Sequence, residues 1–595
     1  MGWPSKYDGC FDKNRTLTAD PDVDGQGVVA SFVANGWITV AIVSCHYLFV
    51  FDPTIPPFRT KTSSSTAAAQ GGQPNRDTTE LSTWTPNPID KLISDKRSQL
   101  LKPAKSKMAI FVPESLKLWL KCEQTGDALK KCVLSLCDAQ LITGLSMLLS
   151  GYITLLEYEK MSLAHWYMII NLAWFSNLTH QGGLIFLRGY LYQNSSERLW
   201  RLVLMVLLLV ALACAMAPTI LAVQYDTYLG AQPATPAVCF FNYEVADALF
   251  REGDINQGSI TKTGAFQIGT VAFLILLLSF ATRLVKLFET SSRFVRDRIR
   301  APIARVLRGV LSRFITIGID RQNMAAMFRI RLFFFENPAL AIYLFLRICM
   351  DIYTSALSDV SWLLLSALFG TIQLGIQRSS VARVEEFDFG QVLPVMLLGA
   401  AVLPIRQAFV PLSPEPLIST SSVNTSPSTR RRSSQMSSVC LTLTSTSHVA
   451  WAPEGHFLSQ AIYTEDIWLL PTLFNVVAAI FLFFQLIASS GGSDAASLVV
   501  SMAFSFGVIS LACCAVILVG LTVGEYPLGK VIIWFFGLQP LGAIALLARA
   551  VMMHTISFHE RDQVISMLAI LFSAAAVLGV EYCVVCLFVI LRPKK

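Results

Sequence analysis

The feature that most constrains this chain is a series of long apolar runs that carry almost no charge. Each run has roughly 18 or more residues, enough for a helix to cross a bilayer. Only 15% of the residues are charged, against about 25% in soluble globular proteins. Backbone groups in lipid must bond within their own segment, so such runs predict helices. We therefore expect an all-α polytopic transmembrane helical bundle with about eleven crossings, within a range of roughly ten to twelve.

Basic residues indicate the orientation of the bundle, because cytoplasmic loops are rich in Lys and Arg. They predict an N-terminus outside and a C-terminus inside, with the plasma membrane as the expected location. The expected parts are an extracellular segment 1–26, a transmembrane helix 27–51, a partly disordered cytoplasmic loop 52–132, helices two to five in 133–290 with an extracellular loop 224–263, a basic amphipathic cytoplasmic segment 291–332, further transmembrane helices in 333–410, a Ser/Pro/Arg-rich disordered cytoplasmic loop 411–466, and a four-helix transmembrane module 467–591.

Region 333–377 leaves the number of crossings ambiguous. It holds two short apolar stretches, and Arg347 and Asp351 follow the first of them. These two residues are four positions apart on one helix face, so they form a candidate ion pair. If both stretches crossed, the loop with Arg430–Arg432 would lie outside, against the positive-inside rule. We therefore predict one net crossing here, with part of the region interfacial or re-entrant.

The predicted topology gives the loops several modification sites. Asn14 begins an Asn-Arg-Thr sequon on the outside and is a candidate glycosylation site. Cys10 and Cys239 both lie outside, where an oxidising compartment favours a disulfide between them. On the inside, Ser433 and Ser434 follow an Arg run and are candidate phosphorylation sites.

Acidic residues precede the first crossing. The stretch Asp20–Gly25 matches the first half of an EF-hand loop, but the twelfth loop position holds Ser31 instead of Glu. Acids at a helix N-terminus also interact favourably with the helix dipole. We favour this helix start over a calcium site, and we predict no metal and no cofactor.

Between Arg293 and Arg313, Arg residues alternate with apolar residues at helical spacing. This pattern predicts a basic amphipathic helix that binds anionic lipid of the inner leaflet. The alternative is a cytosolic helix packed on the bundle. The lipid bilayer is thus the expected partner, and no basic patch with interleaved aromatics points to nucleic acid.

Polar residues inside predicted membrane helices are the functional candidates. The helix from Ala164 to Arg188 is the richest, and its candidates are Asn171, Trp174, Asn177, His180 and Gln181. All but His180, which sits at the edge, fall within an arc of roughly 120°. This face either lines a ligand cavity or polar pathway, or it forms a seam with other helices, which we favour. Glu581 in the last helix either relays protons or binds a cation, or it is a structural acid.

The same helix carries a resemblance to a known family. Its residues His165-Trp166, Leu172 to Ser176, Leu178 to His180 and Leu187-Arg188 resemble a recurrent pattern in uncharacterised polytopic membrane proteins of filamentous fungi. Stretches Asp22–Val28 and Asp138–Gly144 are similar to the same family, as is Phe389-Gly390-Gln391 with Pro394. The resemblance covers roughly residues 10–410. It implies a fungal origin and a membrane location, and it brings no activity.

The expected function follows only in outline. A transport or channel-like role fits the polar helix face and Glu581. The alternative is a seven-helix receptor-like protein, or a sensor or scaffold that works through its cytoplasmic loops. The sequence has no recognisable nucleophile–base set or metal-ligand set, so we do not expect an enzyme.

Overall fold

The computed structural model is built from helices. It describes residues 5–12, 14–55, 58, 86–107, 123–157, 160–221, 233–253, 264–295, 332–379, 389–400, 468–476, 495–523, 531–536 and 576–587, with isolated positions between 298 and 309 and at 529. Within these ranges there is no β-strand, and an isolated bridge joins Ser162 to Pro236. The all-α fold expected from the sequence is therefore present over the described residues.

The helices have the following bounds: η1 Ser5–Phe11, α1 Pro21–Asp24, α2 Gln26–Phe49, α4 Pro88–Lys107, α6 Glu123–Leu156, α7 Leu163–Phe186, α8 Arg188–Gln193, α9 Ser195–Leu221, η3 Ala237–Phe241, α10 Tyr243–Gly253, α11 Gly264–Leu287, α12 Glu289–Phe294, the π-helical turn η7 Leu332–Glu336, α15 Asn337–Thr354, α16 Ala356–Ser379, α17 Phe389–Ala400 and α21 Ala495–Val523. Shorter helical pieces span residues 469–476, 531–536 and 576–587.

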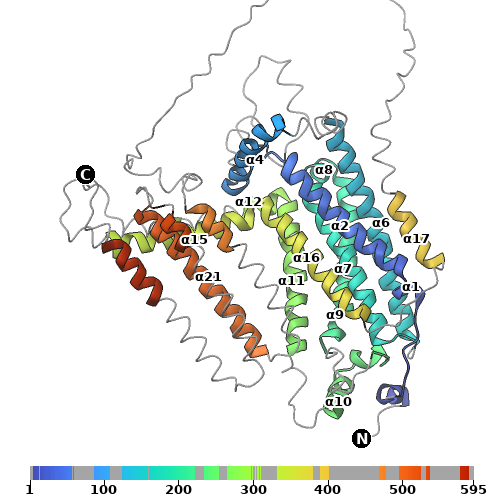
Figure 1. Ribbon diagram of the computed structural model, residues 1–595. Helices are drawn as coiled ribbons and strands as arrows, with labels where there is room; N and C mark the ends of the chain where they lie inside the picture. Colours follow the sequence, from blue (N-terminus) through green and yellow to red (C-terminus); the bar gives the residue numbers. More distant parts are fainter. Residues whose placement is uncertain are drawn as a thin grey trace, which may run out of the picture.

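Helix α7 forms the centre of the larger helix group. Helices α2, α6, α9, α11 and α16 pack around it (Figure 1), and nearly all of its side chains from Leu163 to Leu184 are buried. Ser162 begins the helix, because its Oγ accepts a hydrogen bond from the backbone N–H of His165 at 3.2 Å. The helix has 24 residues, roughly 36 Å, which is enough to cross a hydrocarbon core of about 30 Å.

Small residues let the neighbouring helices approach α7 closely. A Cβ atom on Gly370 of α16 would lie only 2.9 Å from Trp174 Cδ1. On another side of α7, a Cβ on Gly144 of α6 would overlap the side chain of Ser176. Lipid is as apolar as the helix faces, so membrane helices associate through close packing of this kind more than through apolar burial.

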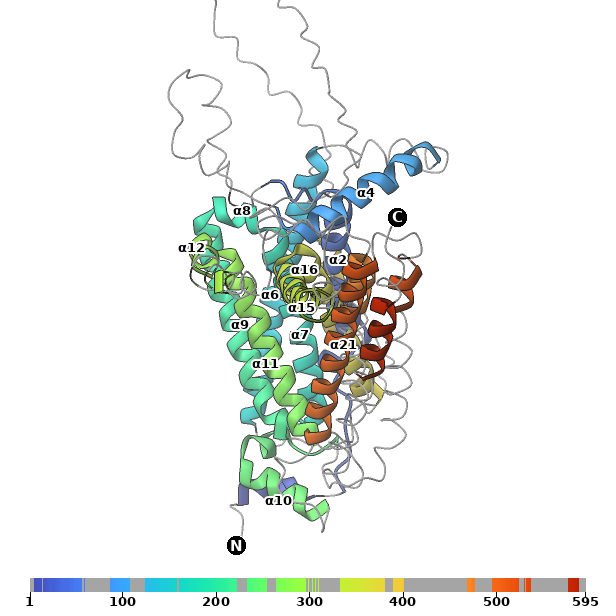
Figure 2. The same ribbon diagram turned by 90° about the vertical axis from the view of Figure 1, so that its left-hand side faces the viewer.

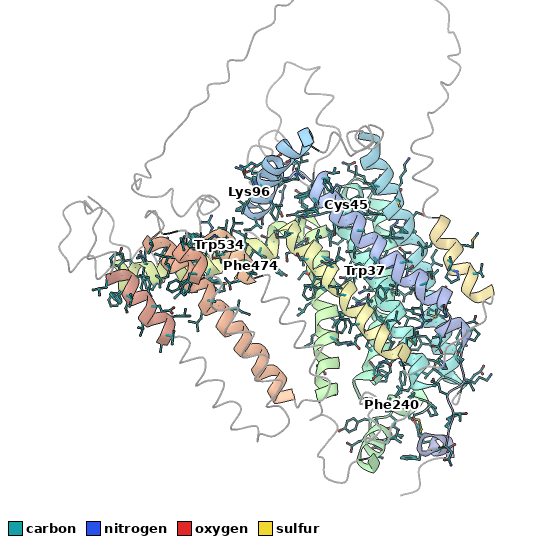
Figure 3. The ribbon with its side chains drawn as sticks, in the orientation of Figure 1. Trp37, Cys45, Lys96, Phe240, Phe474 and Trp534 are labelled. Atoms are coloured by element: carbon teal, nitrogen blue, oxygen red, sulfur yellow. A yellow bond between two sulfur atoms is a disulfide. The ribbon has the colours of Figure 1, made fainter. Side chains whose placement is uncertain are left out.

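A second, smaller helix group is built around α15 and α21. The short pieces pack against these helices, and Figure 3 places Phe474 and Trp534 in this group, away from Trp37 on α2. Helix α15 runs across the direction of α7, α9 and α11 in Figure 1 and is seen end-on in Figure 2. A break at Ser355 separates it from α16, so region 333–377 contains two helices. One net crossing by this region stays a prediction.

The two ends of the larger group are built differently. At one end, called here the disulfide end, Cys10 of η1 and Cys239 of η3 form a disulfide, and α10 lies beside them (Figure 2). The opposite end, called here the α8 end, carries α4, α8 and α12. The sequence assigns the segments at these two ends to opposite sides of the membrane. Which end faces outside stays a prediction.

Five of the described helical segments are long and apolar enough to cross a membrane. They are Pro21–Phe49, Leu129–Leu156, Ser195–Thr219, Phe333–Thr354 and Ala356–Gly375. This is fewer than the roughly eleven crossings that the apolar runs predict. Helix α7 falls outside the five although it is long enough, because polar residues interrupt its apolar sequence. Most of segment 411–591 lies outside the described residues.

Two loops contain helices that the sequence does not predict. Loop 52–132, expected to be partly disordered, contains α4, and loop 224–263 contains η3 and α10. Helix α4 is held at the α8 end by its polar side chains. Asp90 Oδ2 accepts the N–H of Ala356 at 2.9 Å, and Arg97 Nη1 donates to the carbonyl of Phe51 at 3.1 Å. Such tertiary contacts stabilise a helix whose own sequence is mostly polar.

Candidate functional site

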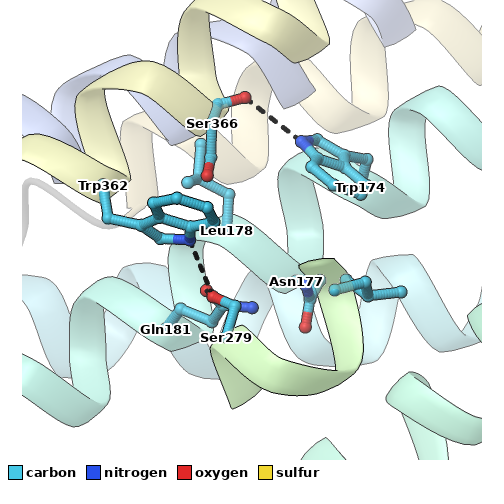
Figure 4. Close-up of a pocket in the computed structure, with 8 residues that line it drawn as sticks. Trp174, Asn177, Leu178, Gln181, Ser279, Trp362 and Ser366 are labelled. Atoms are coloured by element: carbon cyan, nitrogen blue, oxygen red, sulfur yellow. Dashed lines mark hydrogen bonds between the residues drawn. The ribbon is translucent and has the colours of Figure 1, made fainter. Parts of the chain in front are cut away.

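The polar face of α7 lines a small cavity inside the larger helix group. The cavity lies between α7, α11 and α16 (Figure 4). Its lining consists of Trp174, Asn177, Leu178, Gln181, Leu276, Ser279, Trp362 and Ser366. It leaves about 10 Å³ for the centre of a water molecule, which is room for about one water. The face is therefore both a seam between helices and the wall of a cavity, the two alternatives that the sequence left open.

Indole groups from α7 and α16 cross-link the cavity walls. Trp174 Nε1 donates to the carbonyl of Ser366 at 3.2 Å, and Trp362 Nε1 donates to Ser279 Oγ at 2.8 Å (Figure 4). Ser279 Oγ in turn donates to Gln181 Oε1 at 2.9 Å. Buried polar groups in lipid must find such partners, because a group left unpaired costs several kcal/mol. The network joins all three helices around the cavity.

Arg283 extends this network towards the α8 end. It lies one helical turn beyond Ser279 on α11, and its Nη1 donates to Gln181 Oε1, to Ser279 Oγ and, at 3.2 Å, to the carbonyl of Ser279. The side chain is 4% exposed. Among the described residues, no carboxylate lies within ion-pair distance of it. A buried cation that is bonded only to neutral groups is costly to keep, so it is a functional candidate.

The polar column ends in a group of charged side chains. Lys286 Nζ donates to both oxygens of Asp359, at 2.9 and 3.0 Å. Arg188, the first residue of α8, lies near the same carboxylate. Polar groups thus continue from Asn177 in the cavity through Arg283 to the charged residues at the α8 end.

The other candidates on α7 lie away from the cavity. Asn171 is half-buried and does not line it. His180 is 2% exposed, and neither of its ring nitrogens has a hydrogen-bond partner among the described residues. Its position at the edge of the polar arc turns it away from the cavity that Gln181 lines. The structure therefore brings together Trp174, Asn177 and Gln181 and leaves out Asn171 and His180.

A buried Ser–His–Asp group lies near the disulfide end. His165 Nε2 lies 2.8 Å from Asp24 Oδ2, and His165 Nδ1 lies 2.8 Å from Ser162 Oγ. His165 is a residue of α7, Ser162 is the N-cap of α7, and Asp24 is a residue of α1. Ser162 also caps α7, and all three residues are buried. We interpret the group as a structural link between α1 and α7. Asp20 caps the start of α1, and Asp24, the last residue of α1, turns its carboxylate inward to His165.

A second polar contact holds α2 against α6. Asn35 Nδ2 donates to Gln140 Oε1 at 2.8 Å, and Ser176 Oγ donates to the carbonyl of Gln140. Asn35 and Gln140 line another small cavity, which Pro394 of α17 lines as well. This contact carries no charge, and hydrogen bonds between side-chain amides of this kind join membrane helices.

The remaining candidates lie outside the seam. Glu581 is in helix 576–587 of the second group. The Arg347–Asp351 pair is present on α15, with Nε and Oδ2 3.9 Å apart. Asn14 is exposed. Ser433 and Ser434 lie outside the described residues, as does most of segment 293–313.

Sequence reasoning missed the partners of α7. Ser279, Trp362 and Ser366 are ordinary residues of apolar helices, and only the packing of α11 and α16 on α7 gives them a role. Arg283 lies four residues from the end of α11, where a long basic side chain is expected to reach the interface. Only the burial of Arg283 in the structure identifies it as a candidate functional residue.

No family model, curated protein or solved structure matches the chain. The candidate function therefore depends on the geometry of the seam, and the resemblance to the fungal family stays a prediction.

Proposed function

We propose that this chain is a transport or channel-like membrane protein that moves a small polar solute along the seam between α7, α11 and α16. The proposal keeps the predicted topology: about eleven crossings, the N-terminus outside and the C-terminus inside, in the plasma membrane. The disulfide end then faces the outside and the α8 end faces the cytosol.

The observation that carries the proposal is the polar column from Asn177 to Arg283. Its members come from separate helices and meet in the interior of the larger helix group. A packing seam needs only paired neutral groups, whereas this one contains a buried guanidinium. Ionisable side chains kept at such depth in membrane proteins usually serve a solute or proton pathway.

The size of the cavity indicates which state of the cycle this is. Room for about one water is too little for an open path. Trp174 and Trp362 close the cavity by their bonds to Ser366 and Ser279. Transporters expose such a site alternately, by moving one group of helices against another. In this proposal α16 is the element that moves. The cavity opens when the hydrogen bonds that the Trp174 and Trp362 indoles donate are broken.

Flux through purified, full-length protein in liposomes tests the proposal. We would measure chloride, inorganic phosphate and glycerol flux for the unmodified chain and for Asn177→Leu and Gln181→Leu. Either change should lower flux of the transported solute roughly tenfold, since it removes a side-chain hydrogen bond to the solute, which contributes about 1.4 kcal/mol.

Asn171→Leu is the matched control, because it makes the same change on the same helix outside the cavity lining. It should leave flux unchanged, as should Glu581→Gln in the second helix group. Absence of flux for all three solutes, or an equal loss in Asn171→Leu, would contradict the proposal.

The alternative is a receptor-like or sensor protein that works through its cytoplasmic loops. Helix α4 is the observation that favours the sensor alternative, because this helix of the cytoplasmic loop is hydrogen-bonded both to the start of α16 and to the end of α2. Asp90 accepts hydrogen bonds from the first N–H groups of α16, and Arg97 donates to carbonyls at the end of α2. Movement of α16 would then pass to the loop. This alternative would be supported if the protein showed no flux and if the contacts of α4 changed when a ligand was added.

A further inference from the structure

Cations outnumber carboxylates where α8, α11 and α16 meet. Arg188 begins α8, Arg283 and Lys286 lie near the end of α11, and Asp359 lies in the first turn of α16. Both oxygens of Asp359 are bonded to Lys286. Arg188 and Arg283 lie within the electrostatic reach of that carboxylate, but among the described residues neither forms an ion pair with it. The cluster therefore has a surplus of two positive charges.

The two guanidinium groups have unused hydrogen-bond donors. Nε of Arg283 and Nε of Arg188 are buried, and neither has a partner among the described residues. Arg188 has its guanidinium 4.4 Å above the ring of Phe58. Burial lowers the pKa of Arg188 to about 10, and nearby Asp359 acts in the opposite direction. Arg188 thus keeps its charge at neutral pH although its surroundings disfavour it.

Other charged residues at this end already have partners. Asp90 of α4 lies within electrostatic reach of Asp359, and its carboxylate accepts the N–H groups of Ala356 and Leu357. Glu289 of α12 accepts a hydrogen bond from Tyr192 at 2.6 Å and pairs with Arg293. Arg198 of α9 places its guanidinium 5.1 Å from the ring of Phe288. Among the described residues, none of these groups forms an ion pair with Arg188 or Arg283.

We propose that Arg188 and Arg283 bind a near-dianionic phosphate group, either free phosphate or a phosphomonoester, at the α8 end of the bundle, with Lys286 and Asp359 completing the site. A guanidinium presents its N–H donors in a fork that matches phosphate oxygens. A phosphate monoester carries about 1.5 to 2 negative charges at pH 7, which matches the surplus of the cluster. A carboxylate ligand would neutralise only one of the two arginines.

Two sources can supply this group. One is free inorganic phosphate from the cytosolic side. The other is the headgroup of a phosphomonoester lipid, since basic pockets between helices on the cytoplasmic side bind anionic headgroups. Binding does not require transport through the seam, so the site stands or falls separately from the proposed function.

Thermal unfolding of the full-length protein tests the site. In neutral detergent, the unfolding temperature is measured against inorganic phosphate, with chloride at equal ionic strength as the reference. In phosphatidylcholine nanodiscs, it is measured with added phosphatidic acid, which has a phosphomonoester, or with phosphatidylserine, which does not. The variants are Arg283→Gln and Arg188→Gln, and Arg198→Gln is the control at the same end of the bundle.

We expect phosphate or phosphatidic acid to raise the unfolding temperature more than its reference does. Each arginine variant should weaken the apparent affinity roughly tenfold or more, because a charge-assisted hydrogen bond is lost, and Arg198→Gln should bind as the unmodified chain does. A response to free phosphate identifies the solute as the source, and a response to phosphatidic acid alone identifies the lipid.

The proposal is overturned if neither compound exceeds its reference. It is also overturned if Arg188→Gln responds as strongly as the unmodified chain. Arg188 is less buried than Arg283, so its variant decides the question even if Arg283→Gln does not fold.

Discussion

Arg283 on α11 donates a hydrogen bond to the amide oxygen of Gln181 on α7, where a carboxylate would be the usual partner of a buried guanidinium. The same amide oxygen accepts a bond from Ser279. Gln181 is thereby the meeting point of the neutral cavity and the charged α8 end. This relationship separates the seam from an ordinary helix contact, in which amides bond to neutral groups alone.

The salt bridge between α6 and α9 provides a first prediction, on stability. The Arg201 guanidinium donates hydrogen bonds to both carboxylate oxygens of Asp138, at 2.8 and 2.9 Å, and to Glu197 Oε2 at 2.9 Å. Arg201→Met should lower the free energy of unfolding by about 2 kcal/mol, because charged partners are left unpaired. Arg201→Lys should recover only part of the loss, since an ammonium lacks the fork. Thermal unfolding in detergent checks this. A fully stable Arg201→Met would show that the bridge is dispensable.

Two glycines of α16 offer a matched test of packing against α7. A Cβ on Gly370 would lie 2.9 Å from Trp174, while a Cβ on Gly375 would meet nothing within 4 Å. Gly370→Ala should lower stability by about 1–3 kcal/mol through overpacking. Gly375→Ala should raise it by roughly 0.5–1 kcal/mol, since Ala favours the helix. Unfolding temperatures that fall equally in both variants would mean that α16 does not pack closely against α7 at Gly370.

The disulfide end has its own stability contribution. The bond between Cys10 and Cys239 closes a loop with a sequence separation of 229 residues. Cys10→Ser should lower the free energy of unfolding by about 2–5 kcal/mol, and Cys239→Ser should match it. The double variant should lose no more than either single one. A further loss in the double variant would show that the two sulfurs act separately.

Burial of Asp90 predicts a dependence of stability on pH. Desolvation raises the pKa of Asp90 above 3.8, although hydrogen bonds from Ala356, Leu357 and Tyr47 act in the opposite direction. A raised folded-state pKa adds stability below the unfolded-state pKa, and this stability is lost as pH rises through the folded-state pKa. The stability difference between the unmodified chain and Asp90→Asn should therefore fall from pH 3 towards neutral pH (roughly 7). A difference that is constant or rises over this range would contradict the burial of an ionisable Asp90.

The sequence predicts the helix class and several boundaries well. Apolar runs predict a transmembrane helix over residues 27–51, where α2 lies, and cysteine placement predicts the disulfide. It does not predict α4, because that helix depends on contacts of Asp90 and Arg97 with distant helix ends. It also does not predict that α15 lies crosswise, since hydropathy reports how apolar a helix is and says nothing of its direction.

The candidate site shows the same limit. Periodicity identifies Trp174, Asn177 and Gln181, because residues of one helix share a face at a fixed angle. The partners on α11 and α16 follow from tertiary packing, which one sequence does not encode in any local pattern. Arg283 in particular looks like a helix-end cation until its 4% exposure is known.

Cysteine accessibility tests the central claim, that the seam opens to water. The measurement uses the full chain in liposomes, with the free cysteines changed to Ser and the disulfide kept. Asn177 is buried in this structure, but Asn177→Cys should react with a membrane-impermeant thiol reagent when the seam opens, because Asn177 lines the cavity. Ser176→Cys should not react, because Ser176 is 0% exposed and faces Gln140. An Asn177→Cys protein that stays as unreactive as Ser176→Cys would contradict the account.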